Sequence, residues 1–385
     1  MSDRTVIVGG GLGALRTAQA LRDEQYDGDV MIVSAESVLP YDRPPLSKSF
    51  LLEGLSEDRL LLTSAADLAA SRIEFCPESR GIALDLEQNR VTLEHGDELS
   101  YDALVVATGA RPIRLPMFHG LEGVAYLRDL HDARRLRAEL LEQPRVGIVG
   151  GGFIGLEIAV AARARGCEVT IVELARTPLA GILGEQMGAW VQAWHEQHGV
   201  RFRCGTPLTA ARGDVRPEQL ILADGSAVEV DLVVVGVGVR PEVDWLTAAG
   251  LSTHIGLVCD GAGRTSDPNV FGVGDVTCRH ADGACMPSGH WTATNEQARA
   301  AAATVLGRAA HARSLRPGYF WSDQYDHRLQ FAGAVTRSAR FTVSSGALEE
   351  QSFVALLRDE EEVTGVFAID SARDFVKTSR LALSG

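Results

Sequence analysis

The chain has 385 residues, of which 45% are hydrophobic and 23% are charged, as in an ordinary globular protein. This length exceeds what one compact core usually holds, so we expect two or three domains. The net charge of −14 argues against a nucleic acid or an anionic membrane as the main partner, because both require a mainly basic surface. No apolar run approaches the ~20 residues of a membrane span, and the N-terminal apolar segment has no basic leader, which predicts a cytoplasmic protein.

The first predicted element is a short β-branched strand, Val6–Val8, which runs into glycines and then into the helical pattern "LRTAQALRDE". In such a loop the first glycine makes a tight turn, the second lets the backbone approach a pyrophosphate, and the third position needs a small residue. The helix N-terminus then offers unpaired N–H groups to the phosphates. The candidate nucleotide-binding residues are Gly9, Gly11, Leu12, Gly13 and Ala14. The next predicted strand, "VMIVSAE", ends at Glu36, whose carboxylate suits a ribose 2′-hydroxyl.

The same pattern returns at residues 145–159, "RVGIVGGGFIGLEIA", and the strand "EVTIVE" follows it and ends at Glu173. One such loop is weak evidence, but here each copy has its second strand at the expected distance and an acid at the end of that strand. The sequence therefore predicts that two dinucleotides are bound. The glycines of the second loop are Gly150, Gly152 and Gly155.

The six cysteines are scattered and form no C-x-x-C pair, so their spacing indicates neither a zinc knuckle nor a vicinal redox pair. Cys278 and Cys285 could coordinate a metal together with His280. No second cluster completes such a site. We therefore expect no metal and interpret these cysteines as buried structural thiols.

Several segments together resemble one family. "YDALVVATGARP" (101–112) and "TSDPNVFGVGDVT" (265–277) are typical of flavoproteins with two dinucleotide-binding domains. "PYDRPPLSK", "GGGFIGLE", "YLRDL", "HWTATNEQA" and "GYFWSDQYDHRLQFAG" resemble the NADH-dependent ferredoxin reductases of Rieske dioxygenase and bacterial P450 systems. The resemblance covers essentially the whole chain. Residues 40–51 contain no cysteine where thiol-relay relatives carry theirs, so thiol relay chemistry is not expected.

The resemblance implies an α/β fold with two Rossmann-like dinucleotide-binding domains and a small C-terminal α+β domain. The FAD-binding domain is expected to be discontinuous, over residues 1–112 and 240–308. The NAD(H)-binding domain is expected at 113–239, and the C-terminal domain, near the flavin and the ferredoxin, at 309–385.

The resemblance also assigns residues to each cofactor by position. For FAD these are Gly9, Gly11, Leu12, Gly13, Ala14, Glu36, Arg43, Lys48, Gly81, Ala107, Thr108, Gly109, Arg128, Gly274, Asp275, Trp291 and Trp321. For NAD(H) they are Gly150, Gly152, Phe153, Ile154, Gly155, Glu157, Glu173, Arg176 and Gly238.

The expected catalytic pair is Lys48 with Glu157. The resemblance places Lys48 beside the flavin N5 edge, paired with Glu157, which comes directly after the second glycine loop. A lysine ammonium there would favour the anionic reduced flavin, and a facing carboxylate would keep that ammonium charged and in place.

The implied reaction passes hydride from NADH to FAD and then single electrons to a small [2Fe–2S] ferredoxin that serves an oxygenase. The expected protein is a monomer or weak dimer. Because such ferredoxins are acidic, docking needs a local basic patch. The candidates are Arg313, Arg316, Arg337, Arg340, Lys377 and Arg380.

Two alternatives stay open. One is a rubredoxin reductase or another cysteine-free NADH-dependent flavoprotein reductase, such as the nitrite-reductase type. The other is a binding flavoprotein, similar to apoptosis-inducing factor, that responds to NADH with little turnover.

The chain departs from the family pattern in two places. Pro287 and Gly289 stand where relatives often have an arginine and an acid before the tryptophan. After Glu173, Thr177 and Gly181 replace the usual arginines, while Arg176 stands one place early. NADH is the expected donor, with NADPH as the alternative, because Arg176 is near enough to the strand end to reach a 2′-phosphate.

Overall fold

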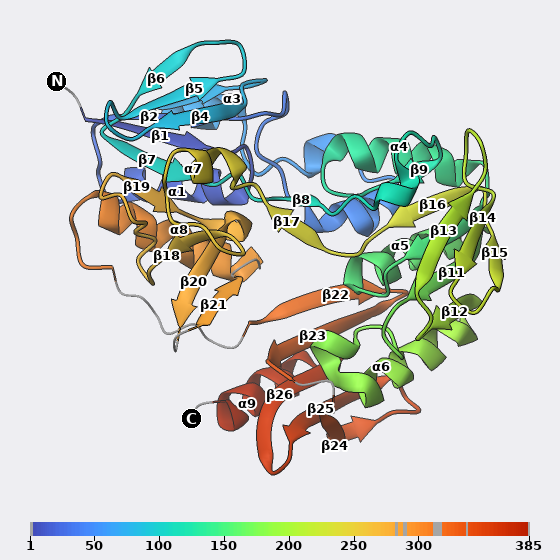
Figure 1. Cartoon of the computed structure of the whole chain (residues 1–385). Helices are drawn as coiled ribbons and strands as arrows, with labels where there is room; N and C mark the ends of the chain where they lie inside the picture. Colours follow the sequence, from blue (N-terminus) through green and yellow to red (C-terminus); the bar gives the residue numbers. More distant parts are fainter. Residues whose placement is uncertain (1–2, 282–283, 288–290, 311–317, 336–337, 384–385) are drawn as a thin grey trace. The chain divides into compact units, whose positions relative to one another are not determined.

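The computed structural model describes residues 3–281, 284–287, 291–310, 318–335 and 338–383 (Figure 1). The chain divides into two compact units, each assembled from three separate segments. The first comprises Met1–Asp42, Glu57–Arg111 and Val239–Leu315. The second comprises Arg43–Ser56, Pro112–Gly238 and Arg316–Gly385. Within the described residues, no helix has the combination of length and apolarity that a bilayer span requires.

The first unit is built on a five-stranded sheet in the order β19-β7-β1-β2-β3, in which all neighbours pair in parallel. Its strands are β1 (Arg4–Val8), β2 (Asp29–Val33), β3 (Ile73–Cys76), β7 (Ala103–Val106) and β19 (Val270–Gly272). The carboxyl ends of parallel strands meet at one edge of the sheet, so the loops that follow β1, β7 and β19 are gathered there.

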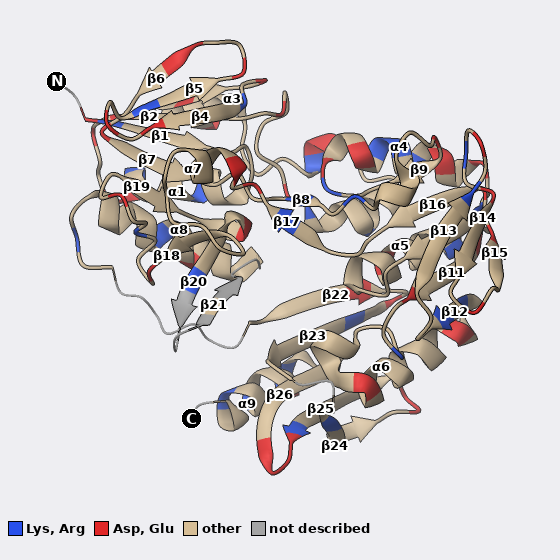
Figure 2. Cartoon of the chain, viewed as in Figure 1, with Lys and Arg blue, Asp and Glu red and all other residues tan. Residues whose placement is uncertain are grey.

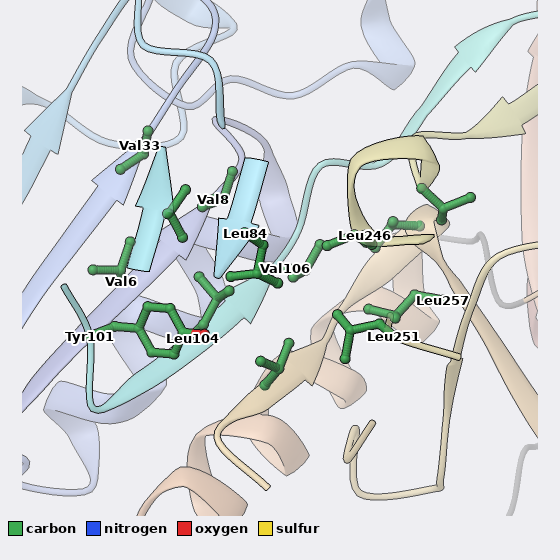
Figure 3. Packing of buried hydrophobic residues seen from close by; sticks show 14 of the residues in the cluster. Val6, Val8, Val33, Leu84, Tyr101, Leu104, Val106, Leu246, Leu251 and Leu257 are labelled. Atoms are coloured by element: carbon green, nitrogen blue, oxygen red, sulfur yellow. The ribbon is translucent and has the colours of Figure 1, made fainter. Parts of the chain in front are cut away.

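The two faces of this sheet are covered differently, because successive side chains along a strand point to opposite sides. Val6 and Val8 of β1 join a buried cluster with the antiparallel strands β4 (Gly81–Asp85), β5 (Arg90–Leu93) and β6 (Glu98–Ser100) (Figure 3). Ile7 faces the other way, into a cluster with helices α1 (Leu12–Asp23) and α8 (Trp291–Val305). The β-branched run thus makes a strand that is buried on both faces.

The second unit repeats this plan with a parallel sheet in the order β12-β11-β10-β16-β9. Its strands are β9 (Val124–Ala125), β10 (Arg145–Val149), β11 (Glu168–Glu173), β12 (Val200–Cys204) and β16 (Leu232–Val235). An antiparallel group packs on one face through a buried valine and leucine cluster; it consists of β13 (Leu208–Arg212), β14 (Gln219–Leu222) and β15 (Ala227–Glu229). The helices of this part are α4 (Leu130–Leu141), α5 (Phe153–Ala164) and α6 (Ala180–Gln197).

The second unit also contains an antiparallel five-stranded sheet in the order β22-β23-β26-β25-β24, together with helix α9 (Ala372–Ala382). Its strands are β22 (Phe320–Gln324), β23 (His327–Gly333), β24 (Arg340–Ala347), β25 (Ser352–Asp359) and β26 (Glu362–Ile369). Strand β22 meets helix α5, where the Phe153 and Phe320 rings pack edge to face with centroids 4.6 Å apart. This sheet is therefore fixed to the helix that follows the second glycine loop.

The remaining helices, strands and turns are short. They are α2 (Ser49–Leu52), α3 (Ala65–Ala70), α7 (Asp244–Ala248), β8 (Ala110–Pro112), β17 (Val239–Pro241), β18 (Leu257–Cys259), β20 (Thr277–Ala281), β21 (Ala284–Pro287) and the 3₁₀ turns η1 (Pro44–Ser47), η2 (Glu57–Arg59), η3 (Pro116–Phe118) and η4 (Gly274–Val276).

One predicted strand end is wrong. The sequence predicts a strand that reaches Glu36, but β2 ends at Val33. The Ser34 hydroxyl accepts a hydrogen bond from the Glu36 N–H at 3.1 Å, and this local turn competes with strand pairing. In the second unit the prediction is confirmed, because β11 does end at Glu173.

Candidate functional site

The first glycine loop takes the conformation that its sequence predicts. Gly9 has φ +140°, and a Cβ there would stand 2.1 Å from the Ala107 carbonyl oxygen, so only glycine fits. Gly11 is the N-cap of α1 and has extended backbone, with no side chain capping the helix. Leu12 and Gly13 begin the helix, and Ala14 is completely buried. Gly11 thus offers no side-chain acceptor to the first N–H groups of α1, which fits a phosphate.

Five more of the predicted FAD residues lie in loops at the same edge of the sheet. Ala107, Thr108 and Gly109 follow β7 directly. Gly274, at φ +81°, follows β19, and its N–H donates to the Gln297 side-chain oxygen at 2.7 Å. Asp275 is half-buried beside it.

Three further FAD candidates lie elsewhere in the first unit. Glu36 accepts a hydrogen bond from the Tyr41 hydroxyl at 2.6 Å. Trp291 begins α8, and its indole N–H donates to Asp42 at 3.0 Å. Gly81 begins β4, where an added Cβ would meet the Val8 side chain at 3.1 Å.

The second glycine loop has the same construction. Gly150 has φ +110°, and a Cβ there would stand 2.3 Å from the Gly236 carbonyl oxygen. Gly152 is the N-cap of α5, and nothing lies within 4 Å of the position of its absent Cβ. Gly155 packs against the Gly150 carbonyl oxygen, which would be 2.3 Å from an added Cβ. This open, uncapped helix N-terminus also fits a phosphate.

The acid that follows this loop is tied to the backbone. The two Glu173 side-chain oxygens accept hydrogen bonds from the Gly151 N–H at 2.6 Å and the Ala175 N–H at 2.7 Å. Arg176 is exposed in the same turn. Ile154 is 47% exposed at the helix start, and Gly238, at φ +115°, follows β16. The predicted NAD(H) residues are thus gathered at the carboxyl edge of the second parallel sheet.

The predicted ion pair is present. Lys48 follows the Pro-Pro turn η1, and its Nζ lies 2.8 Å from Glu157 Oε1 on helix α5. Glu157 is only 3% exposed, and a buried carboxylate is stable only when it is paired and hydrogen-bonded. Two hydroxyls also donate to it: Ser47 to Oε2, and Ser322 of β22 to Oε1 at 2.5 Å. Both oxygens are therefore held by donors from distant segments.

The remaining FAD candidates of the second unit are two arginines and a tryptophan. The Arg43 guanidinium donates to the Arg128 carbonyl oxygen at 2.7 Å, so these two predicted residues lie together. The Trp321 ring stacks on Tyr319, with centroids 6.1 Å apart.

Sequence reasoning missed Ser47 and Ser322, although both lie inside the quoted segments "PPLSK" and "FWSDQ". Their signal is a small polar residue in a segment that is otherwise apolar or aromatic. His195 and Gln324 were also missed; they hydrogen-bond to each other, and Gln324 also donates to Ser322. Nothing in the sequence of α6 distinguishes this buried histidine from one on the surface.

The cysteine prediction needs correction. Cys278 and Cys285 are joined in a disulfide between β20 and β21, with their Cα atoms 5.6 Å apart, so they are not free thiols. His254 lies close to this pair, whereas the His280 side chain lies outside the described residues. Burial raises the pKa of Cys204 and of Cys259 to about 12, so both are protonated thiols at neutral pH.

The predicted basic patch lies partly within the described residues. Arg340, Lys377 and Arg380 are exposed on β24 and α9, and Figure 2 colours basic positions blue on both elements. Arg313, Arg316, Arg337 and Gly289, and the Pro287 side chain, lie outside the described residues.

Comparisons with known proteins agree along the whole chain. A model of the pyridine nucleotide-disulphide oxidoreductase family matches residues 3–305, and a reductase C-terminal model matches residues 319–385. The chain is 38% identical to the ferredoxin–NAD(+) reductase component of the anthranilate 1,2-dioxygenase system from Burkholderia cepacia, over 100% of this chain and 95% of that protein.

Two solved structures are similar to this one. The ferredoxin reductase for the CYP199A2 system from Rhodopseudomonas palustris is 33% identical, with a TM-score of 0.93, over 99% of this chain and 95% of that chain. The reductase in a covalent putidaredoxin reductase–putidaredoxin complex is 30% identical, with a TM-score of 0.92, over 99% and 93% of the two chains.

Proposed function

Because the chain belongs to the pyridine nucleotide-disulphide oxidoreductase family, we propose that it is an FAD-dependent ferredoxin reductase. It takes hydride from NADH and passes single electrons to a [2Fe–2S] ferredoxin that serves a Rieske oxygenase or a P450. The relatives named for dioxygenase, CYP199A2 and putidaredoxin systems support this assignment. The observation that carries it is the ion pair between Lys48 and buried Glu157, which follows the second glycine loop in helix α5.

Each glycine loop takes one cofactor. The loop at Gly9 holds the FAD pyrophosphate, with Glu36 on the adenosine ribose and Asp275 on the ribityl chain. Arg43, Arg128 and Trp321 also contact FAD. The FAD-binding domain comprises residues 1–112 and 240–308. The NAD(H)-binding domain comprises 113–239, and the C-terminal domain comprises 309–385. When bound, FAD converts a two-electron donor into a source of single electrons.

The loop at Gly150 holds NAD(H), with Glu173 on its ribose. The Glu173 carboxylate is fixed by two backbone N–H groups, and a negative charge at that place disfavours a 2′-phosphate. NADH is therefore the proposed donor, and Arg176 is the residue that would admit NADPH.

Lys48 and Glu157 supply placement and charge. Lys48 presents an ammonium to the flavin, and Glu157 keeps that ammonium in one position. No thiol takes part in the proposed reaction, which agrees with the raised pKa of half-buried Cys204 and of buried Cys259.

Stopped-flow reduction of the flavin by NADH tests this proposal. Lys48→Met and Glu157→Ala should each slow the reduction ~10-fold or more, equal to about 1.4 kcal/mol in the barrier. Arg90→Met, which breaks an exposed ion pair with Glu98, is the control and should react like the unaltered protein. Unchanged rates in the two variants would remove both residues from the site. A purified chain that binds no FAD would overturn the proposal itself.

Electron transfer to a ferredoxin is tested separately, by cytochrome c reduction that depends on added [2Fe–2S] ferredoxin. The rate should fall steeply as salt is added, because exposed charges steer the two proteins together. Equal rates with rubredoxin would favour the rubredoxin reductase alternative.

A further inference from the structure

A continuous chain of hydrogen bonds runs behind Glu157, through the interior of the second unit. The Tyr325 hydroxyl lies 2.9 Å from His195 Nδ1 on α6, and His195 Nε2 lies 2.8 Å from the Gln324 side-chain oxygen. The Gln324 amide nitrogen donates to the Ser322 hydroxyl at 2.9 Å, and that hydroxyl donates to Glu157 at 2.5 Å. Four bonds thus connect α6, β22 and α5.

The donors and acceptors in this series of hydrogen bonds can be assigned in one direction only. Gln324 presents its carbonyl oxygen to His195 and its NH₂ to Ser322, so His195 must donate from Nε2. His195 is completely buried, and burial lowers its pKa to about 4, so its imidazole is neutral at physiological pH. A neutral imidazole that donates from Nε2 accepts at Nδ1, which makes the Tyr325 hydroxyl the donor there.

Every donor in this chain points toward the Glu157 carboxylate. Hydrogen bonds aligned head to tail polarise one another and are strengthened where the surroundings exclude water. His195, Ser322 and Gln324 are each 0% exposed, so none of them finds a substitute partner in solvent. The final bond, from the Ser322 hydroxyl to Oε1, is short for a hydrogen bond between two oxygens.

The series of hydrogen bonds ends at Glu157, a member of the candidate catalytic pair. Ser322 and Lys48 donate to the same oxygen of Glu157, while Ser47 holds the other oxygen. The position of that carboxylate therefore depends on β22 as much as on its own helix. Removal of the Ser322 hydroxyl would leave Lys48 as the one remaining donor to Oε1 among the described residues.

We propose that His195, Gln324 and Ser322 form a positioning relay that fixes the Glu157 carboxylate and, through it, the Lys48 ammonium. Through Ser322 and Gln324 of β22, the C-terminal antiparallel sheet thereby helps to position the reactive pair. The kinetic part of this proposal rests on the proposed function, whereas the structural part concerns the Lys48 amine alone.

The amine can be measured directly, because Lys48 and Lys377 are the only lysines in the sequence. Brief labelling of the purified full chain with acetic anhydride, followed by mass spectrometry, gives the reactivity of Lys48 relative to that of exposed Lys377. In Ser322→Ala we expect this ratio to rise at least threefold, because a displaced carboxylate holds the ammonium less well. Ser322→Thr keeps the hydroxyl and should restore the original ratio.

A second pair of variants tests the relay further from Glu157. His195→Gln keeps an N–H donor toward Gln324 and should leave the labelling ratio near its original value, whereas His195→Leu should raise it. Ser79→Ala, which removes another buried serine hydroxyl in the first unit, is the control. A cooperative thermal transition near that of the unaltered chain shows which variants are folded and can be compared.

The kinetic readout separates positioning from a general loss of structure. In Ser322→Ala the maximal rate of flavin reduction should fall ~5- to 10-fold, while the NADH concentration at half-maximal rate changes less than twofold. A folded Ser322→Ala chain with an unchanged labelling ratio would overturn the relay. If the unaltered protein is not reduced by NADH, the proposed function fails, yet the labelling experiment still decides the relay.

Discussion

The two glycine loops are alike at the first glycine and at the start of the helix. They differ at the third small position and at the acid that follows. In both, the first glycine has positive φ and lies against the carbonyl oxygen of a neighbouring strand end, that of Ala107 for Gly9 and that of Gly236 for Gly150. In both, the helix that follows starts without a side-chain cap. The shared part is therefore fixed by backbone packing and by the need for a free helix N-terminus.

The difference lies in the third small position and in the acid. The first loop accepts Ala14, whereas Gly155 lies against the Gly150 carbonyl oxygen and has no room for a methyl group. Glu36 is held by a side chain, that of Tyr41, while Glu173 is held by two backbone N–H groups. In the second unit the acid is thus also a structural part of its own loop. The two copies of the motif therefore differ in how tightly the third small residue is packed and in whether the acid holds its own loop.

The largest expected effect comes from the first glycines. Gly9→Ala should yield a protein that does not retain FAD, and Gly150→Ala should bind FAD but react with NADH at least ~100-fold more slowly, because the added methyl group pushes each strand-end carbonyl away. Flavin absorbance after gel filtration and stopped-flow reduction measure the two losses. Loss of flavin from both variants alike would contradict the separate assignment of the loops.

The next largest effect is expected at the third small position of each loop, Ala14 and Gly155, on the free energy of unfolding. Gly155→Ala should lower the free energy of unfolding by about 3 kcal/mol, because the methyl group meets a backbone carbonyl that cannot move away. Ala14→Gly in the first loop should lower the free energy of unfolding by only about 1 kcal/mol, which is typical of glycine in place of alanine within a helix. Urea unfolding of both variants measures the difference. Equal costs would mean that the two helices approach their strands equally closely.

Acidification should weaken the second unit through His195. Its pKa is 6.5 when unfolded and about 4 when folded, so below pH 6.5 the unfolded chain binds a proton that the folded chain does not. The contribution is fully present above pH 6.5 and is lost as the pH falls to about 4, by about 3 kcal/mol in total. Urea unfolding over this range measures it, and His195→Gln should lack this part of the slope. An identical slope in the variant would show that the histidine is protonated in the folded state.

The smallest effects should come from the two acids. Glu173→Gln loses one acceptor for a backbone N–H and should raise the NADH concentration for half-maximal rate ~10-fold. Glu36→Gln keeps an oxygen for the Tyr41 hydroxyl and should leave that concentration unchanged. Steady-state kinetics with saturating ferredoxin compare the two. A change of equal size in both variants would remove the distinction between the acids.

Much of the fold was predictable, because local patterns decide it. The β-branched runs at Val6–Val8 and Val146–Val149 did form central parallel strands, and the helices after both loops begin where the glycines end. The Lys48–Glu157 pair was predictable from the family resemblance. The strand limit at Val33 was not, because a single serine side chain decides it.

The polar network around Glu157 was not predictable from the sequence. Ser322 and Glu157 are separated by 165 residues, and His195 and Gln324 by 129, so no periodicity or spacing relates them. A buried histidine in α6 also looks like any other residue of an amphipathic helix until its neighbours are known. The Cys278–Cys285 disulfide was missed for a similar reason, since the pairing depends on the β20–β21 hairpin rather than on a recognisable motif.

The strand order of the first unit has a consequence for synthesis on the ribosome. Strand β7 is complete at Val106, but its partner β19 is not made until residues 270–272, after the whole second parallel sheet has emerged. At 5–20 residues per second, the β7 edge waits roughly 10–30 s for that partner. An exposed parallel edge is a template for pairing with other chains. The nascent polypeptide is therefore most in need of chaperone protection while its middle third is being translated.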